Sequence, residues 1–257
     1  MVSRIAAHRG GALEAAENTL EAFAHALSLG VEEIECDVHL SCDGQIMVHH
    51  DATLDRMTDG HGPLSACTAQ ALRGLRIKGS ATARMPLLSE VLALLGAGDT
   101  VLRLELKRDV HGRLYEGLAE AALAEIGRAR LRERSYITNF AVDYLRAPAV
   151  ADSGLARLLL MEAETFRDIG ALDGLARILD LAGTRQVALP IGALSSDLVA
   201  TARARDVAVS AFGCHTDAQI RAALDLRLPV FTSDRPSVAL LMRDGRSHAS
   251  VPDRSVG

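Results

Sequence analysis

Tryptophan is absent from this 257-residue chain, and aromatic residues make up only 3% of it. A large core must therefore be built from aliphatic side chains, and a hydrophobic content of 49% is ample for one. Apolar stretches are short, and none reaches the ~20 residues that a membrane-spanning helix requires. The net charge is −5 without a long basic run, so the composition gives no indication of a nucleic-acid partner.

Cysteine and lysine are also scarce. The cysteines lack both the spacing of a metal site and that of a disulfide framework, which is typical of thiols in a reducing compartment: Cys36, Cys42, Cys67 and Cys214. No signal-peptide pattern precedes the first apolar run at 5–8. We therefore expect a cytoplasmic protein, and the sequence leaves its oligomeric state open. Only Lys78 and Lys107 are lysines among the 28 basic residues.

Short apolar runs alternate with segments of helical periodicity along residues 1–246. Parallel strands are predicted at 5–8, 31–40, 100–106, 134–139, 155–161, 186–190, 207–212 and 229–232. Helices are predicted from a capping-box-like Asn18-x-x-Glu21 to Gly30, and at 86–95, 112–127, 141–148, 165–182, 195–204, 216–226 and 236–243. Eight such units in about 250 residues predict a single TIM barrel, with an open doubly wound sheet as the alternative. Residues 247–257 are predicted to be a polar tail.

A further extended run at 45–49 follows the turn signal Ser41-Cys42-Asp43-Gly44. A connection of this length is too short for a parallel crossover, so this run should return antiparallel as a hairpin. Residues 41–85 are therefore predicted to form a small insertion after the second strand. If Leu40 pairs with Gln45, the register places His50 opposite Glu35, with Cβ atoms ~5 Å apart.

Four short motifs lie at or near strand ends: His8-Arg9-Gly10, Glu35-Cys36-Asp37, His50-Asp51 and Glu105-Leu106-Lys107. Alternate strand residues face the same side, so Glu35 points with Asp37, and Glu105 with Lys107. Active sites of TIM barrels assemble at the carboxyl ends of the strands. Each motif alone has a structural alternative, since a single strand-end histidine or a Glu-x-Asp pair is commonly structural or solvated. Their coincidence in barrel order favours one common site.

The chemistry of these residue types indicates phosphoryl transfer at a metal ion. Two carboxylates ~4 Å apart repel each other by about 4 kcal/mol at an effective dielectric of 20. A divalent cation relieves this repulsion, and all-oxygen ligands favour Mg²⁺ or Ca²⁺ over Zn²⁺. Imidazole is the side chain best suited to carry protons near neutral pH, so His8 and His50 are the candidates for the proton transfers of phosphodiester cleavage. Arg9 and Lys107 supply positive charge for phosphoryl oxygens. Other histidines, such as His39 and His215, are interpreted as structural or surface residues.

At this level of detail the chain resembles the glycerophosphodiester phosphodiesterase family. Beyond the four motifs, the resemblance covers Glu17-Asn18-Thr19, Asp43-Gly44, Ala52-Thr53-Leu54-Asp55-Arg56, Thr58-Asp59-Gly60 and Thr232-Ser233-Asp234-Arg235-Pro236. It implies a TIM barrel with an insertion after the second strand. It also implies metal-dependent hydrolysis of small glycerophosphodiesters to glycerol 3-phosphate and an alcohol.

The resemblance further implies a role for each site residue. His8 and His50 become the general acid and base, Arg9 and Lys107 contact phosphate, and Glu17 and Asp51 support their neighbours. The metal ligands become Glu35, Asp37 and Glu105. Which ion binds, and whether water or the glycerol 2-hydroxyl attacks the phosphorus, stays open.

Three positions depart from the family pattern. Ala16 stands where proline is usual, and Asn139 precedes Phe140 where serine is often found. Ser210 stands where the family often has a tryptophan on the alcohol side of the pocket, so the alcohol is not predicted. Two other functions are considered: a lysophospholipase D acting on lipids, and a barrel that binds a phosphosugar without turning it over. The first would need an apolar entrance, and the second usually loses a catalytic group that this chain keeps.

Overall fold

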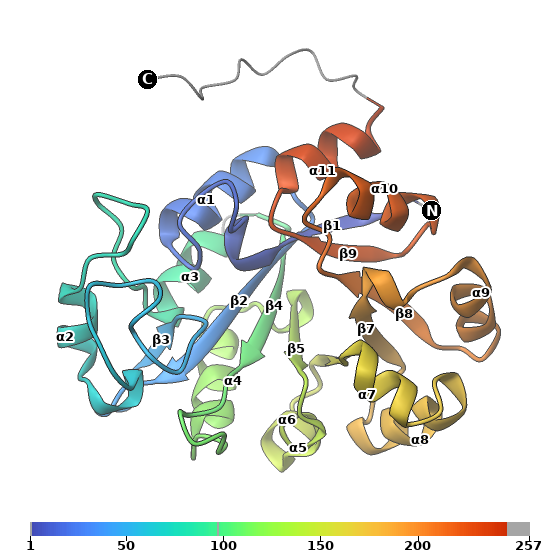
Figure 1. Ribbon diagram of the computed structural model, residues 1–257. Coiled ribbons are helices and arrows are strands. Elements are labelled where there is room, and N and C mark those ends of the chain that lie inside the picture. The colour runs from blue at the N-terminus through green and yellow to red at the C-terminus, as the bar shows by residue number, and fades with distance from the viewer. Residues whose placement is uncertain (1, 97, 246–257) are drawn as a thin grey trace.

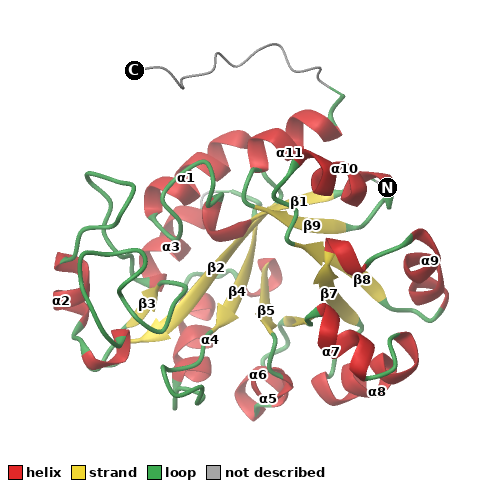
Figure 2. Cartoon of the chain, viewed as in Figure 1, coloured by secondary structure: helices red, strands yellow, loops and turns green. Residues whose placement is uncertain are grey.

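The computed structural model describes residues 2–96 and 98–245, and its strands form one sheet that closes on itself (Figures 1 and 2). The closed ring runs in the order β1-β9-β8-β7-β6-β5-β4-β2, with β1 pairing again to β2, and every neighbouring pair in it is parallel. These strands are β1 Arg4–Ala7, β2 Glu33–Leu40, β4 Val101–Leu106, β5 Ser135–Asn139, β6 Ala156–Leu160, β7 Gln186–Pro190, β8 Ala208–Phe212 and β9 Val230–Ser233. The predicted TIM barrel is confirmed, and the open sheet is wrong.

Helices surround the barrel and connect successive strands (Figure 2). They are α1 Leu20–Leu29, α2 Ala69–Gly74, α3 Leu88–Leu95, α4 Leu118–Arg128, α5 Val142–Arg146, α6 Pro148–Ala151, α7 Ala163–Asp168, α8 Leu172–Ala182, α9 Ser196–Ala204, α10 Asp217–Asp225 and α11 Pro236–Arg243. Four 3₁₀ turns complete the list: η1 His8–Gly10, η2 Leu64–Ala66, η3 Arg132–Arg134 and η4 Ile191–Ala193. No helix in residues 2–96 and 98–245 has the length and apolarity to cross a membrane.

Three predicted helices differ from the structure for local reasons. The predicted helix 165–182 is two helices, because Gly170 and Ala171 adopt left-handed φ angles of 83° and 54° between them. The helix predicted at 112–127 begins only at Leu118. The residues before it form a turn, in which the Asp109 carboxylate accepts hydrogen bonds from the backbone N–H groups of His111 and Arg113. Residues 141–148 are divided at Pro148, which opens α6. The predicted tail at 247–257 lies outside the described residues.

The hairpin forms as predicted, but its register is one residue from the expected one. β3 (Ile46–Val48) pairs antiparallel with β2, and Leu40 lies opposite Ile46 rather than Gln45. The reason is a three-residue turn closed by Ser41, whose N–H donates to Gln45 O at 3.0 Å. The predicted pairing of His50 with Glu35 is therefore wrong, and His50 lies beyond the end of β3.

The insertion after β2 has its own small core, at the left of Figure 1 beside β3. Its buried members are apolar: Met47, Leu54, Leu64, Ala69, Leu72, Ile77, Ala83 and Met85. This cluster is separate from the main core, which fills the space between the barrel and its helices. The segment is therefore a packed structure that can hold polar side chains at fixed positions.

The strand β2 is buried on both faces, as a barrel strand must be. Ile34, Cys36 and Val38 belong to the main core, while the alternate residues Glu35 and Asp37 face the barrel interior. The apolar residues thus fix the strand against the main core. Because side chains alternate along a strand, the acidic residues between them must point to the opposite face, into the barrel.

We expect Leu104→Ala to lower the free energy of unfolding by about 2–5 kcal/mol, because Leu104 on β4 is fully buried in the main core. Urea unfolding followed by circular dichroism would measure the change. The matched control is Leu181→Ala on α8. Because this side chain is 48% exposed, the change should lower the free energy of unfolding by no more than about 0.5 kcal/mol. Equal losses in both variants would contradict the assigned core.

Candidate active site

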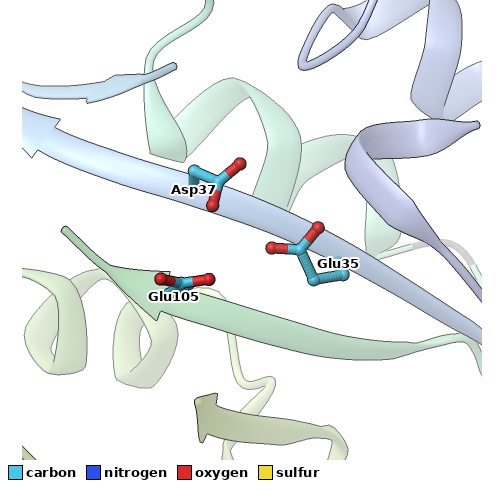
Figure 3. A group of neighbouring side chains, drawn as sticks. All are labelled: Glu35, Asp37 and Glu105. Carbon is cyan, nitrogen blue, oxygen red and sulfur yellow. The ribbon is translucent and has the colours of Figure 1, made fainter. Parts of the chain in front are cut away.

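Three buried carboxylates from two adjacent strands converge at the carboxyl end of the barrel (Figure 3). Glu35 and Asp37 lie on β2, and Glu105 lies directly opposite Asp37 in the register with β4. One oxygen from each can be chosen so that all lie within 4.8 Å of one another. The predicted convergence is confirmed, and the donor set of oxygens alone fits a hard divalent cation.

The pKa values of these carboxyls reflect burial and crowding. Burial, together with the charges of Asp37 and Glu105, raises the pKa of Glu35 well above its usual range. Burial also raises the pKa of Glu105 to about 7, although Lys107 opposes the shift. Burial would raise the pKa of Asp37 as well, but the positive charges of Lys107 and Arg9 outweigh it and hold the pKa low. When all three carboxylates are ionised, their negative charge exceeds the positive charge of the neighbouring side chains. A bound cation would balance the excess.

Lys107 contacts two of the three carboxylates. Its Nζ donates to Glu105 Oε1 at 2.7 Å and lies 2.9 Å from Asp37 Oδ1. Burial alone would lower the pKa of Lys107, but these two charges outweigh it and raise the pKa. The predicted Glu105–Lys107 alternation therefore places an obligate positive charge inside the acidic cluster.

Arg9 is held by a backbone turn that begins where β1 ends. Its φ of 51° is left-handed, and its N–H donates to Glu35 Oε2 at 3.0 Å. Its side chain donates from Nη1 to Glu17 Oε1 at 3.0 Å, and Nε lies 3.5 Å from Asp37 Oδ2. A Cβ at the next residue, Gly10, would lie 2.8 Å from Ala22 Cβ, so only glycine fits there.

Asn18 has a role that the predicted helix cap did not foresee. Its Nδ2 donates to Asp37 Oδ2 at 2.9 Å, while its own φ of 56° is left-handed. The N-cap of α1 is instead Thr19, whose hydroxyl accepts from the Ala22 N–H at 3.1 Å. The Glu17-Asn18-Thr19 motif was the available signal for this contact, and local capping rules assigned Asn18 wrongly.

His50 reaches the site through contacts outside the strand ladder. Its Nδ1 donates to Asp51 Oδ1 at 2.6 Å, so the contact with Asp51 uses Nδ1 and not the second ring nitrogen, Nε2. Its carbonyl accepts a hydrogen bond from His39 Nε2 at 3.1 Å, and His39 Nδ1 lies 3.0 Å from the Tyr115 hydroxyl. Burial lowers the pKa of His50. Asp51 thus orients its neighbour as expected, and the buried His39 fixes the backbone of His50.

His8 is oriented by Asp234, a residue that the sequence reasoning did not assign to the site. His8 Nδ1 donates to Asp234 Oδ1 at 2.5 Å, and His8 Nε2 lies 4.0 Å from Glu35 Oε2. His215 shares the same carboxylate, with its Nδ1 2.8 Å from Asp234 Oδ2. Asp234 follows β9, which pairs with β1 only because the barrel closes. Its signal was the Thr232–Pro236 motif.

A cavity of about 290 Å³ joins these groups and has two unlike walls. The polar wall contains His8, Arg9, Glu35, His50, Glu105 and Lys107. The other wall contains Leu158, Leu160, Phe140 and Phe212, with Glu162 also in the lining. A larger hollow of about 670 Å³ lies at the amino ends of β7 and β8, but no residue of the polar wall or the carboxylate cluster lines it. The smaller cavity is therefore the candidate active site.

Comparison with known proteins agrees with this geometry. Residues 8–238 match the model of the glycerophosphoryl diester phosphodiesterase family. The chain belongs to this family. A glycerophosphodiester phosphodiesterase of Caldanaerobacter subterraneus is 35% identical over 145 residues, which cover 54% of this chain and 59% of that protein. The match therefore spans less than two thirds of that relative.

Solved structures of the family share the fold. A structure from Agrobacterium tumefaciens carries the name glycerophosphoryl diester phosphodiesterase and is 30% identical to this chain. The match covers 95% of this chain and 98% of the other, with a TM-score of 0.91. A phosphodiesterase of Oleispira antarctica, solved with the product sn-glycerol-3-phosphate, is 23% identical, covers 95% and 97%, and has a TM-score of 0.78. At that identity the second similarity supports the fold alone.

The three departures from the family pattern have local accounts. Phe212 lines the cavity and meets Phe140 edge to face at 5.7 Å, whereas Ser210 is buried and does not line it. Asn139 donates to Leu106 O and accepts from the Ala141 N–H, so it ties β5 to β4. Ala16 packs against the small core of the insertion. The aromatic side of the pocket is thus built from phenylalanines.

We expect a divalent cation to bind this cluster at least about tenfold more weakly at pH 6 than at pH 8. The pKa of Glu105 near 7 means that protons compete for its oxygens at the lower pH. Calorimetric titration with Mg²⁺ or Ca²⁺ would measure the affinity. Glu105→Gln should bind weakly at both pH values, while Glu120→Gln, an exposed change on α4, should match the unaltered protein. An affinity independent of pH would count against this site.

Proposed function

We propose that this chain hydrolyses glycerophosphodiesters to glycerol 3-phosphate and an alcohol, with Mg²⁺ or Ca²⁺ held by Glu35, Asp37 and Glu105. The observation that carries the proposal is the carboxylate cluster beside two imidazoles, His8 and His50, each bonded through Nδ1 to a carboxylate. The family match supports the same substrate class.

Each charged group has a separate task in this proposal. When bound, the cation would neutralise charge on the phosphoryl oxygens. Arg9 and Lys107 line the same cavity and would bind those oxygens from the protein side. Asp37 stays ionised at neutral pH because Lys107 and Arg9 lie beside it, so it can act as a ligand without first losing a proton.

The two imidazoles carry the protons. Hydrogen bonds to Asp51 and Asp234 fix Nδ1–H on His50 and His8, which leaves Nε2 of each ring to exchange a proton with substrate. We assign His50 as the base, because burial lowers its pKa and so favours the neutral ring that can accept a proton, and we assign His8 as the acid. Detection of a cyclic glycerol phosphate would identify the 2-hydroxyl, rather than water, as the nucleophile.

We expect purified protein to release glycerol 3-phosphate from glycerophosphocholine, and EDTA to abolish the release because the phosphoryl charge is then uncompensated. A coupled assay for glycerol 3-phosphate measures it. His8→Ala and His50→Ala should each be inactive. His61→Ala is the control, since this exposed histidine of the insertion pairs with Asp55 and is not among the residues that line the cavity. Equal rates with and without EDTA would contradict the proposed metal requirement. Full activity of His8→Ala or His50→Ala would contradict the role assigned to that histidine.

We expect Asp234→Asn to lower kcat by roughly 10–100-fold, because the amide can no longer hold a protonated His8 Nδ1 as an ionised acceptor does. Steady-state kinetics would measure the loss, with circular dichroism to verify folding. His215→Gln serves as the control, since His215 shares Asp234 but does not line the cavity. If the control lost as much activity as Asp234→Asn, the assignment of Asp234 to His8 would fail.

The apolar wall keeps a lipid substrate in consideration. Phe140 is 42% exposed and lines the cavity with Phe212, which is the kind of entrance a lyso-lipid needs. A lysophospholipase D of Rattus norvegicus is 49% identical over 57 residues, but these are only 22% of this chain and 18% of that protein. Faster turnover of a lyso-lipid than of the soluble diester would favour this activity. Tight ligand binding without product would instead favour the non-catalytic barrel.

A further inference from the structure

Arg56 in the insertion binds two carboxylates that come from different parts of the chain. Its Nη1 and Nη2 donate to Glu17 at 3.0 and 2.6 Å, and its Nε and Nη2 donate to Asp51 at 2.6 and 3.1 Å. Both contacts are bidentate, so a single guanidinium bridges the loop after β1 and the loop after β3. These hydrogen bonds raise the pKa of Arg56.

Each of these carboxylates also holds a group that lines the cavity. Glu17 Oε1 accepts from Arg9 Nη1 at 3.0 Å, and Asp51 Oδ1 accepts from His50 Nδ1 at 2.6 Å. Arg56 itself is not among the residues that line the cavity. Hydrogen-bond donors and carboxylate acceptors therefore alternate from Arg9 to His50, and Arg56 stands in the middle of the series.

The backbone around Arg56 is rigid. Leu54, two residues before it, is a buried member of the insertion core. Thr58, two residues after it, is fully buried, and both its N–H and its hydroxyl donate to Leu54 O, at 3.0 and 2.7 Å. The packed insertion thus presents the guanidinium at a fixed position.

We propose that Arg56 is a positioning residue that aligns Arg9 through Glu17 and His50 through Asp51, and that presenting it is the catalytic task of the insertion. This inference depends on the proposed function. The side chain of Arg56 is 45% exposed, so solvent partly screens the contribution of its ion pairs to stability. Its effect is therefore expected in the kinetics, in both substrate binding and proton transfer.

The first experiment compares three variants on glycerophosphocholine with the metal present. Arg56→Gln should raise KM and lower kcat, with a combined loss of roughly 10–100-fold in kcat/KM. Arg56→Lys should restore only part, because one ammonium cannot bind two carboxylates bidentately. Arg76→Gln is the matched control, since Arg76 lies in the same insertion and pairs only with the exposed Asp59. Its kinetics should match the unaltered protein.

The second experiment separates the two arms. In a Glu17→Gln background, Arg56→Gln should no longer raise KM, and in an Asp51→Asn background it should no longer lower kcat. A merely structural role would reduce the active fraction, which lowers kcat in every background and leaves KM unchanged. Thermal melting of Arg56→Gln and Arg76→Gln verifies that both variants are folded at the assay temperature.

The outcomes distinguish this inference from the proposed function. Failure of the unaltered protein to release glycerol 3-phosphate would overturn the function. An active protein with Arg56→Gln within twofold of it would overturn the positioning role alone. A loss that persists undiminished in both backgrounds would also overturn it, because Arg56 would then act on substrate directly rather than through Glu17 and Asp51.

Discussion

The mutual repulsion of three buried carboxylates is the constraint on which the rest of the site depends. Each pair of charges at ~4 Å costs about 4 kcal/mol at an effective dielectric of 20, and burial adds to it. Burial and, after it, this repulsion raise the pKa values of Glu35 and Glu105, so both groups tend to hold protons. Rigid pairing of β2 with β4 keeps the groups together nonetheless, so the site is prepared for a cation before one arrives.

Asp37 and the two imidazoles are each held by charged partners, and Asp37 also by an amide. Lys107 and Arg9 keep Asp37 ionised, and Asn18 fixes its second oxygen. The two imidazoles have equivalent supports, since each donates Nδ1–H to an aspartate. Such supports orient the reacting nitrogen without contacting substrate. The side chains of the site therefore form a connected hydrogen-bond network, in which each member restricts the orientation of its neighbours.

Strand periodicity and strand order account for the features that the sequence predicts correctly. The eight parallel strands, the shared direction of Glu35 and Asp37, and the approach of Glu105 all come from the period of two and the barrel order, and the structure has each of them. Contacts that depend on turn geometry were not predictable in this way. A three-residue turn shifted the hairpin by one position, and a left-handed φ turned Asn18 from a cap into a partner of Asp37.

Contacts across the closure of the barrel are the hardest to predict, since nothing local indicates them. Asp234 and His8 are 226 residues apart in sequence, and only the pairing of β9 with β1 brings them together. Arg56 poses a similar difficulty, because the insertion core must form before its guanidinium can bridge Glu17 and Asp51. In both cases a charged residue outside the cavity lining holds a part of the site: Asp234 contacts His8 directly, and Arg56 contacts Glu17 and Asp51. The residues that support a site are therefore less visible in sequence than those that touch the substrate, because their geometry depends on the whole fold.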